Sequence, residues 1–203
     1  VLESKVSRAF STSMEIYVED QVFEKQDFRQ KPLPKAEYDN CHFVHCQFDN
    51  TDMSEIHFAD CRFDHCNLSN AKLLQTAFKN IKFKDCKLVG LLFDTCSEFL
   101  FEVDFEHCTL NFSSFSNRKM KKTSWRNCTL QEVDFTGTDL TAAIFLQTTL
   151  SGARFENTVL EKTDFRTATL FSINPEINKM KKARFSAGGA LLLLDKYELE
   201  IEG

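Results

Sequence analysis

The stretch CHFVHCQFDNTDMSEIHFADCRFDHC, residues 41–66, carries a large apolar residue at every fifth position: Phe43, Phe48, Met53, Phe58 and Phe63. The same spacing extends in both directions and runs from Phe23 to Phe93. After a shift of two residues it resumes at Leu100 and continues to Leu170. This repeat explains why a chain of 203 residues contains 21 Phe but only one Trp and three Tyr.

A period of five fits neither of the regular secondary structures. In an α-helix, five residues leave successive apolar side chains about 140° apart, so they would not form a stripe. In a long straight strand, an odd period would send alternate large residues to opposite faces. A chain that turns a corner every five residues can point every large residue inward. The residue two positions earlier shares that side and must be slim. It is Cys, Thr, Ala, Ser, Val or Ile at nearly every repeat, and Arg118 is the exception.

This pattern resembles the A(D/N)Lxx repeat of the pentapeptide-repeat family, over about residues 16–185. The resemblance implies an all-β solenoid, a right-handed quadrilateral β-helix with four repeats in each coil. Residues twenty apart should then stack, and aromatic and leucine positions do fall into separate columns. We predict a core ladder formed by Phe105, Trp125, Phe145 and Phe165 and by Leu110, Leu130 and Leu150.

The break in phase divides the predicted single domain. We expect an N-terminal segment over residues 1–15, a first β-helix block over 16–93, a break over 94–99, a second block over 100–185 and a C-terminal helix and tail over 186–203. Two extra residues suit a small bulge. We interpret the break as a kink; the alternative is a recognition protrusion with Phe99 and Phe101 exposed.

Cysteine and histidine at close spacing, as in residues 41–46 and 61–66, are typical of zinc sites. The repeat predicts otherwise, because its phase points the cysteines inward and the histidines outward. Stacked thiols in a packed core behave as slim apolar residues. A surface pair of His45 and His65 with Asp85 remains as an alternative metal site, which we interpret as a solvated surface. We therefore predict no metal and no cofactor.

Composition narrows the class of protein. Charged residues make up 27% of the chain and hydrophobic residues 42%. This composition is typical neither of a disordered chain nor of a membrane-spanning protein. The first ten residues, VLESKVSRAF, lack the apolar core of a signal peptide, so eight cysteines indicate reduced thiols and a cytoplasmic location. The net charge of −5 argues against general affinity for nucleic acid. We find no catalytic constellation of residues and predict that the protein is not an enzyme.

The sequence changes character at its C-terminal end, SAGGALLLLDKYELEIEG. Ser186 is suited to cap a helix that runs to about Leu194, and Tyr197, Leu199 and Ile201 alternate like a short strand. This element resembles the one through which topoisomerase-directed pentapeptide proteins dimerise tail to tail. The resemblance implies a homodimer with an interface comprising Leu191, Leu192, Leu193, Leu194, Tyr197, Leu199 and Ile201.

The resemblance to that subgroup also implies a function. Its dimers are similar to duplex DNA in shape and acidity, and they bind DNA gyrase or topoisomerase IV, inhibiting it or protecting it from quinolones or toxins. Here the candidate acidic contacts are Asp94, Glu98, Glu102, Asp104, Glu106, Asp134, Asp139, Glu156, Glu161 and Asp164.

Two features depart from that subgroup. Five bases between residues 118 and 126 interrupt any uniform acidic stripe, and no projecting loop as large as those of the quinolone-resistance members is present. The alternative function is a β-helical scaffold for a protein partner of another kind.

Overall fold

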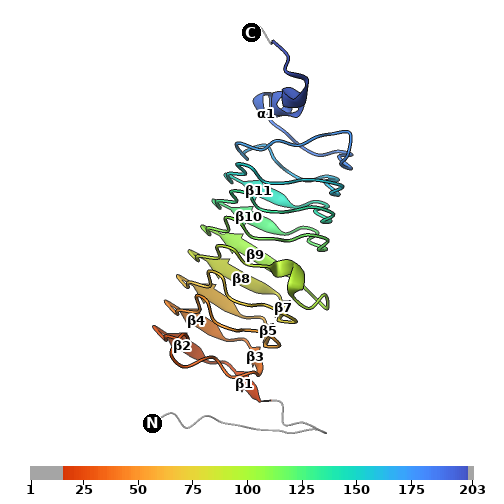
Figure 1. Ribbon diagram of the computed structural model, residues 1–203. Helices are drawn as coiled ribbons and strands as arrows, with labels where there is room; N and C mark the ends of the chain where they lie inside the picture. The colour runs from red at the N-terminus through yellow and green to blue at the C-terminus, as the bar shows by residue number, and fades with distance from the viewer. Residues whose placement is uncertain (1–15, 201–203) are drawn as a thin grey trace.

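The computed structural model describes residues 16–200, which form a rod of stacked coils (Figure 1). Two parallel sheets run along the rod. One consists of β1 (Tyr17–Glu19), β3 (Glu37–Asp39), β5 (His57–Ala59) and β7 (Ala77–Lys79). The other consists of β2 (Val22–Glu24), β4 (His42–Val44), β6 (Arg62–Asp64), β8 (Ile81–Lys84), β9 (Val103–Glu106), β10 (Ser124–Arg126) and β11 (Ile144–Leu146).

The register of these sheets confirms the four-sided coil. Phe43 pairs with Phe63, and Tyr38 pairs with Phe58, so each strand lies beside the segment twenty residues later. We name the four sides by their inward columns. Side A contains Phe43, side B Phe48, side C Met53 and side D Phe58, and the D–A edge is the corner between sides D and A.

Each corner is made by one residue in the left-handed backbone region. Positive φ angles recur every five residues, as at Asn40, His45 and Asn50, with values of 49°, 53° and 58°. This conformation disfavours most side chains but is tolerated by Asn, Asp and Gly. On the D–A edge, the Asn80 side-chain amide donates to the Asp60 carboxylate at 2.6 Å, and Asn40 donates to Asp20 in the same way. Asparagines at this edge therefore link successive coils.

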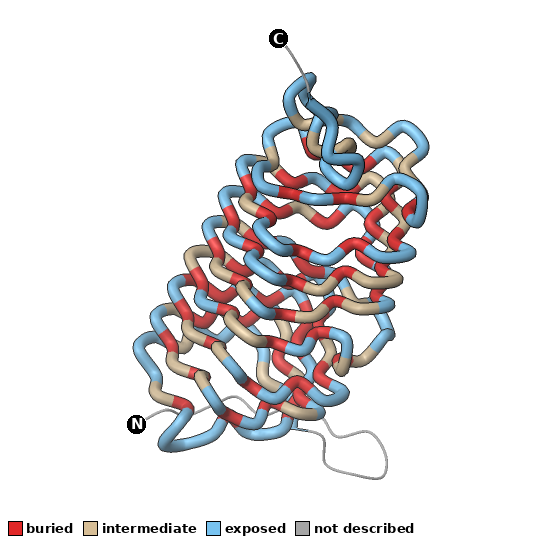
Figure 2. Tube along the Cα trace, turned by 45° about the horizontal axis from the view of Figure 1, so that its top comes forward, coloured by how far each residue is buried: buried red, intermediate tan, exposed pale blue. Residues whose placement is uncertain are grey.

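The core is one continuous column of inward side chains, seen as the repeated buried positions in Figure 2. Phe145 stacks on Trp125 at 4.5 Å between ring centroids, and Phe165 stacks on Phe145 at 4.9 Å. All seven residues of the predicted ladder are buried, the leucines completely. Neighbouring sides meet edge to face, as Trp125 meets Phe135 at 84°. Offset stacks and edge-to-face contacts are the favoured arrangements of aromatic rings.

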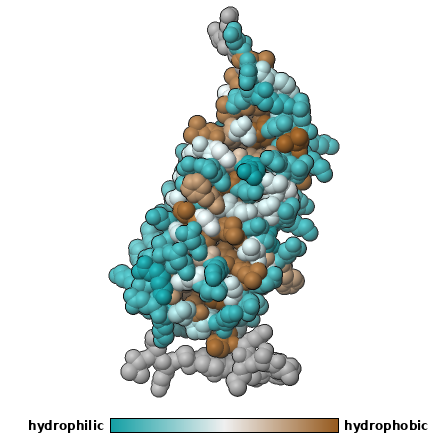
Figure 3. All heavy atoms as spheres, viewed as in Figure 1, coloured by the Kyte–Doolittle hydropathy of each residue, from teal (hydrophilic) through white to brown (hydrophobic). Residues whose placement is uncertain are grey.

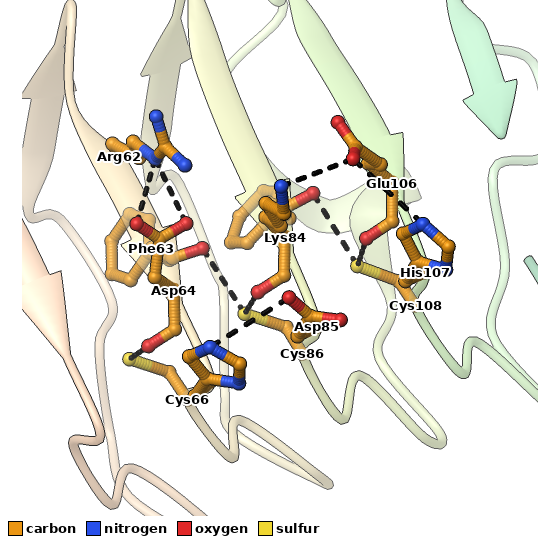
Figure 4. A network of polar contacts seen from close by, with 12 residues as sticks. Arg62, Phe63, Asp64, Cys66, Lys84, Asp85, Cys86, Glu106, His107 and Cys108 are labelled. Atoms are coloured by element: carbon orange, nitrogen blue, oxygen red, sulfur yellow. Dashed lines mark hydrogen bonds and ion pairs between the residues drawn. The ribbon is translucent and has the colours of Figure 1, made fainter. Parts of the chain in front are cut away.

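The slim inward residues satisfy their own polar groups. The Thr158 hydroxyl donates to the Phe135 carbonyl at 2.9 Å, and the Cys86 thiol donates to the Phe63 carbonyl at 3.2 Å. Figure 4 shows this contact at Cys86 and Cys108, and the Cys66 thiol donates to the Phe43 carbonyl in the same way. Cysteine and threonine are thus interchangeable at this position because both are small and can donate to the coil below.

The C-terminal end of the rod is covered by a helical segment (Figure 1). The helix α1 (Ala187–Leu191) begins after Ser186, whose hydroxyl accepts from the Gly189 amide at 3.0 Å, and it continues as the 3₁₀ helix η2 (Leu192–Tyr197). Leu192 and Leu193 pack against the core. The strand expected from Tyr197 onward is wrong, because Tyr197 lies in η2; Ile201 falls outside the described residues.

Trp125 provides a test of the core ladder. Its indole N–H is buried and has no hydrogen-bond partner among the described residues, while the stacked positions above and below it are Phe. We expect Trp125→Ala to lower the free energy of unfolding by about 3–5 kcal/mol through the cavity it leaves. We expect Trp125→Phe to cost about 1 kcal/mol or less, because it also removes an unsatisfied donor. Urea unfolding measures both, and an equal cost for the two variants would contradict the stacked-column description.

Candidate protein-binding site at the phase break

The coil between β8 and β9 is the one place where the repeat changes length. Phe83 pairs with Phe105, an offset of 22 residues instead of 20. The two extra residues lie on side D, after the 3₁₀ helix η1 (Phe93–Thr95), and the chain bulges outward there (the yellow-green turn in Figure 1). We call residues 94–102 the protrusion.

Phe101, and not Leu100, fills the inward position of this coil. The Phe101 ring meets Phe78 and Phe93 with centroid distances of 6.4 and 6.2 Å. Leu100 has a φ of 54° and is 51% exposed, so the prediction that Leu100 resumes the inward series is wrong. Leu170 is likewise exposed, and the neighbouring Phe171 is buried in its stead. In both places the residue with positive φ lies two positions before the expected corner, and the Phe that follows it packs inward.

Arg118 supports the protrusion from the next coil. It breaks the slim-residue rule in the middle of the second block, and it is 5% exposed. Its guanidinium donates through Nη2 to the Asp94 carbonyl at 2.7 Å and to the Cys96 carbonyl, and it lies 5.3 Å from the centre of the Phe101 ring. Buried charge requires hydrogen bonds, which Nη2 makes, whereas the buried Nη1 has no partner among the described residues. Arg118 therefore supplies the donors that a two-residue insertion would leave missing.

The outer surface of the protrusion combines apolar and acidic groups. Phe99 is 77% exposed, and Leu100 lies beside it in the sequence. Asp94, Glu98 and Glu102 are also exposed, and none of their carboxylates has an ion-pair or hydrogen-bond partner among the described residues. The break is thus a protrusion with Phe99 exposed, although Phe101, the other residue of that alternative, is turned inward.

Most of the other candidate acids are occupied within the rod. Asp104 accepts from the Ser124 amide at 2.8 Å, and Glu106 lies 3.2 Å from the Lys84 ammonium group (Figure 4). Asp134 accepts from the Thr136 amide at 2.9 Å.

Asp139 and Asp164 are paired with bases. Asp139 lies 3.3 Å from the Lys121 ammonium group. Asp164 contacts Arg166 at 2.8 Å and Arg184 at 3.4 Å, and the hydrogen bond from Arg166 lowers the pKa of Asp164. These two carboxylates are local partners of basic side chains, so little of their charge is left for an external partner.

Glu156 and Glu161 have no such partner but lie on different sides of the rod, C and D. The ten candidate acids are consequently spread over three sides and do not form one band. On the face seen in Figure 3, hydrophilic and apolar residues are intermixed. The protrusion is the place where several unoccupied acids gather.

The cysteine and histidine positions do not make a metal centre in the described part of the chain, where no group of three or more His, Cys, Asp or Glu side chains is placed to hold an ion. The His45 and His65 rings stack at 4.7 Å, and His65 lies 3.7 Å from Asp85. Burial raises the pKa of the Cys96 thiol to about 12, so it stays protonated near neutral pH.

The residues of the predicted dimer interface fall into two groups in the structure, one turned toward the core and one exposed. Leu192 and Leu193 are turned toward the core, and Leu194 is half-buried. Leu191, Tyr197 and Leu199 are exposed. The tail is tied down by Glu176, which accepts from the Tyr197 hydroxyl at 2.8 Å and pairs with Lys196 at 2.6 Å. A partner would therefore meet the exposed half of this apolar set.

A family model described as a pentapeptide repeat region matches residues 36–97 and 56–133. The chain is a pentapeptide-repeat protein. No curated protein matches it, and no helix in residues 16–200 is long and apolar enough to cross a membrane.

One solved structure shares the fold, and two others give weaker matches. A trypsin-treated form of QnrB1, a plasmid-mediated fluoroquinolone resistance protein, matches with a TM-score of 0.64 and 17% identity, over 92% of each chain. Full-length QnrB1 matches with a TM-score of 0.42 and 16% identity, over 90% of this chain and 100% of that one. HetL from the cyanobacterium Nostoc sp. strain PCC 7120 matches with a TM-score of 0.40 and 16% identity, over 82% and 86% of the two chains.

Arg118 gives a direct test of how this pentapeptide-repeat protein holds its protrusion. We expect Arg118→Met to lower the free energy of unfolding by about 2–4 kcal/mol, because two carbonyls lose a buried donor. Amide exchange in residues 94–102 should become faster in that variant. The matched control is Arg126→Met, an exposed arginine, which should change neither quantity. Unchanged exchange in the Arg118 variant would show that the arginine does not support the protrusion.

Proposed function

We propose that this protein is a non-enzymatic binding scaffold that docks through the protrusion onto a basic surface of a protein partner. The observation that carries the proposal is the group of three exposed, unpaired carboxylates around Phe99, on a coil that is otherwise regular. Exposed aromatic residues rimmed by charge are typical of interaction sites.

The rod itself makes this docking efficient. The protrusion is anchored at Phe101 and at Arg118, so little conformational freedom remains to be lost when a partner binds. Pre-organisation raises affinity by reducing that entropic cost. Carboxylates at the rim favour a basic partner and increase the rate of encounter.

The partner we propose is a type II DNA topoisomerase, DNA gyrase or topoisomerase IV. Two things support it: the fold is that of QnrB1, a fluoroquinolone resistance protein, and the protrusion offers acids to a surface built to hold DNA. Because basic residues interrupt the acids elsewhere on the rod, we restrict the proposed similarity to DNA to the protrusion and its coil. Protection from quinolones or from a toxin would follow from occupying that surface.

A second candidate is a scaffold for a different protein, which the mixed charge of sides A and D favours. On side A, Arg62 pairs with Asp64 at 2.7 Å and Lys84 pairs with Glu106 (Figure 4). Such self-paired charges resemble an ordinary solvated surface more than a DNA surface. The partner of this candidate would still bind at the protrusion.

Gyrase supercoiling, titrated with the purified protein with and without a quinolone, tests the topoisomerase proposal. We expect inhibition, or rescue from the drug, at about micromolar concentration or below, a common range for specific complexes. The triple variant Asp94→Lys, Glu98→Lys, Glu102→Lys should lose the effect. The control variant Glu132→Lys, Glu156→Lys, Glu161→Lys makes the same charge change elsewhere and should keep it.

The outcomes separate the two candidates. No effect of the wild-type protein on gyrase or topoisomerase IV would overturn the choice of partner. A partner captured equally well by wild type and by the protrusion variant would overturn the choice of site.

We further propose that the protein is a homodimer joined at its C-terminal tail. The exposed residues Leu191 and Leu199 would lie at the twofold contact, while Leu192 covers the core. We expect Leu191→Asp with Leu199→Asp to convert a dimer of twice 23.5 kDa into a monomer in light scattering. The control, Leu74→Asp with Leu92→Asp, changes equally exposed leucines on side C and should remain dimeric. A wild-type monomer would refute the interface.

A further inference from the structure

The D–A edge changes its chemistry along the rod. In the N-terminal half its corner residues are Asp20, Asn40, Asp60 and Asn80, which bond in pairs between coils. In the C-terminal half the same corner is occupied by Lys122, Ala142, Lys162 and Lys182. Backbone hydrogen bonds keep this column in register: the Ala142 amide donates to the Glu161 carbonyl at 2.8 Å, and the Lys162 amide donates to the Lys181 carbonyl at 3.0 Å.

Lysine at these corners does not help the fold. All three have φ near 60°, a conformation that Asn and Gly adopt at lower cost. A lysine also forfeits the side-chain bond that Asn80 makes to Asp60. Lysine at this corner is therefore less stabilising than asparagine would be. The positive charges that the lysines add must be explained by something other than the stability of the fold.

The outward residues on both sides of this corner add to its positive charge. The outward residues of sides D and A in residues 119–184 include ten Lys or Arg and three acids, a net charge of +7. The whole chain carries −5, so the remainder carries −12. Two of the three acids are recessed: the Asp139 and Asp164 side chains are 25% and 15% exposed, against 60% for Lys121, whereas Glu161 is half-buried and unpaired among the described residues. The basic groups thus project beyond the acids that accompany them.

Most of this charge is not neutralised within the protein. In the part of the chain that the structure describes, seven of the ten bases have no ion-pair partner. They are Lys119, Lys122, Arg126, Lys162, Lys179, Lys181 and Lys182. They lie on or beside the D–A edge in the coils of residues 119–126, 162 and 179–182, and the intervening coil, 139–147, adds none. Successive coils are spaced about 4.8 Å apart.

We propose that this basic edge, formed by the outward bases of residues 119–184, binds the phosphate backbone of duplex nucleic acid. A stiff row of unpaired cations fits a stiff polyanion, whose condensed counterions are released on contact. The edge has no helix or ribbon to enter a groove, so binding is independent of sequence. Its outward residues are not aromatic in residues 119–184, which disfavours the stacking that single strands require. The inference does not depend on the identity of the protein partner.

The test is fluorescence anisotropy of a labelled 20-base-pair DNA duplex with full-length protein at 50 and 200 mM salt. We expect a Kd in the range of about 1–100 µM at the lower salt and a marked loss of affinity at the higher. Lys122→Asn, Lys162→Asn and Lys182→Asn together install the residue that this corner prefers, so the variant should fold at least as stably. It should bind at least about tenfold more weakly.

The matched control is Lys25→Asn, Lys72→Asn and Lys87→Asn, which removes the same charge away from the basic edge and should weaken binding less than about threefold. Equal weakening by the two triple variants, or no binding of duplex at 50 mM salt, would overturn the proposal. Two further ligands are measured in the same way: vesicles of phosphatidylserine and a single-stranded oligonucleotide. Tighter binding to either of these than to the duplex would also overturn it.

Discussion

The structure depends on the stacking of one coil on the next. Each coil pairs its backbone with the coil twenty residues away and places one large side chain from each side against the same side of its neighbour. A solenoid has no other core, so stability is the sum of these neighbour contacts. Residues that make no contact between coils are accepted only where they do not disturb those contacts. Binding sites can be formed by such residues.

The regular part of this fold could be predicted because it rests on a short-range rule. A large residue every five positions, a slim residue two earlier and Asn at the corners are all visible without knowledge of distant contacts. The inward positions of Phe105 and Trp125 and the twenty-residue register were predictable for that reason. So was the cap of the C-terminal helix by Ser186, which depends on local hydrogen bonding.

The irregular part could not be predicted in the same way. Leu100 and Leu170 keep the five-residue spacing, yet both are exposed, and the neighbouring Phe101 and Phe171 pack against the core in their place. Arg118 was visible as an exception, but its purpose depends on carbonyls in the coil below. The pairing of Asp139 and Asp164 with bases likewise needed the register of whole coils. These contacts are set by tertiary geometry, which no local pattern contains.

The repeat provides stability, and we propose that the break provides recognition. The most direct test is to delete Glu98 and Phe99 and replace Arg118 by Thr, which restores the twenty-residue spacing and places Leu100 inward. The measurement is the urea midpoint of unfolding. We predict a cooperative transition at the same or a higher urea concentration than for the wild type, because the stack would be uninterrupted. A lower midpoint would mean that the protrusion is needed for the fold and would contradict the account.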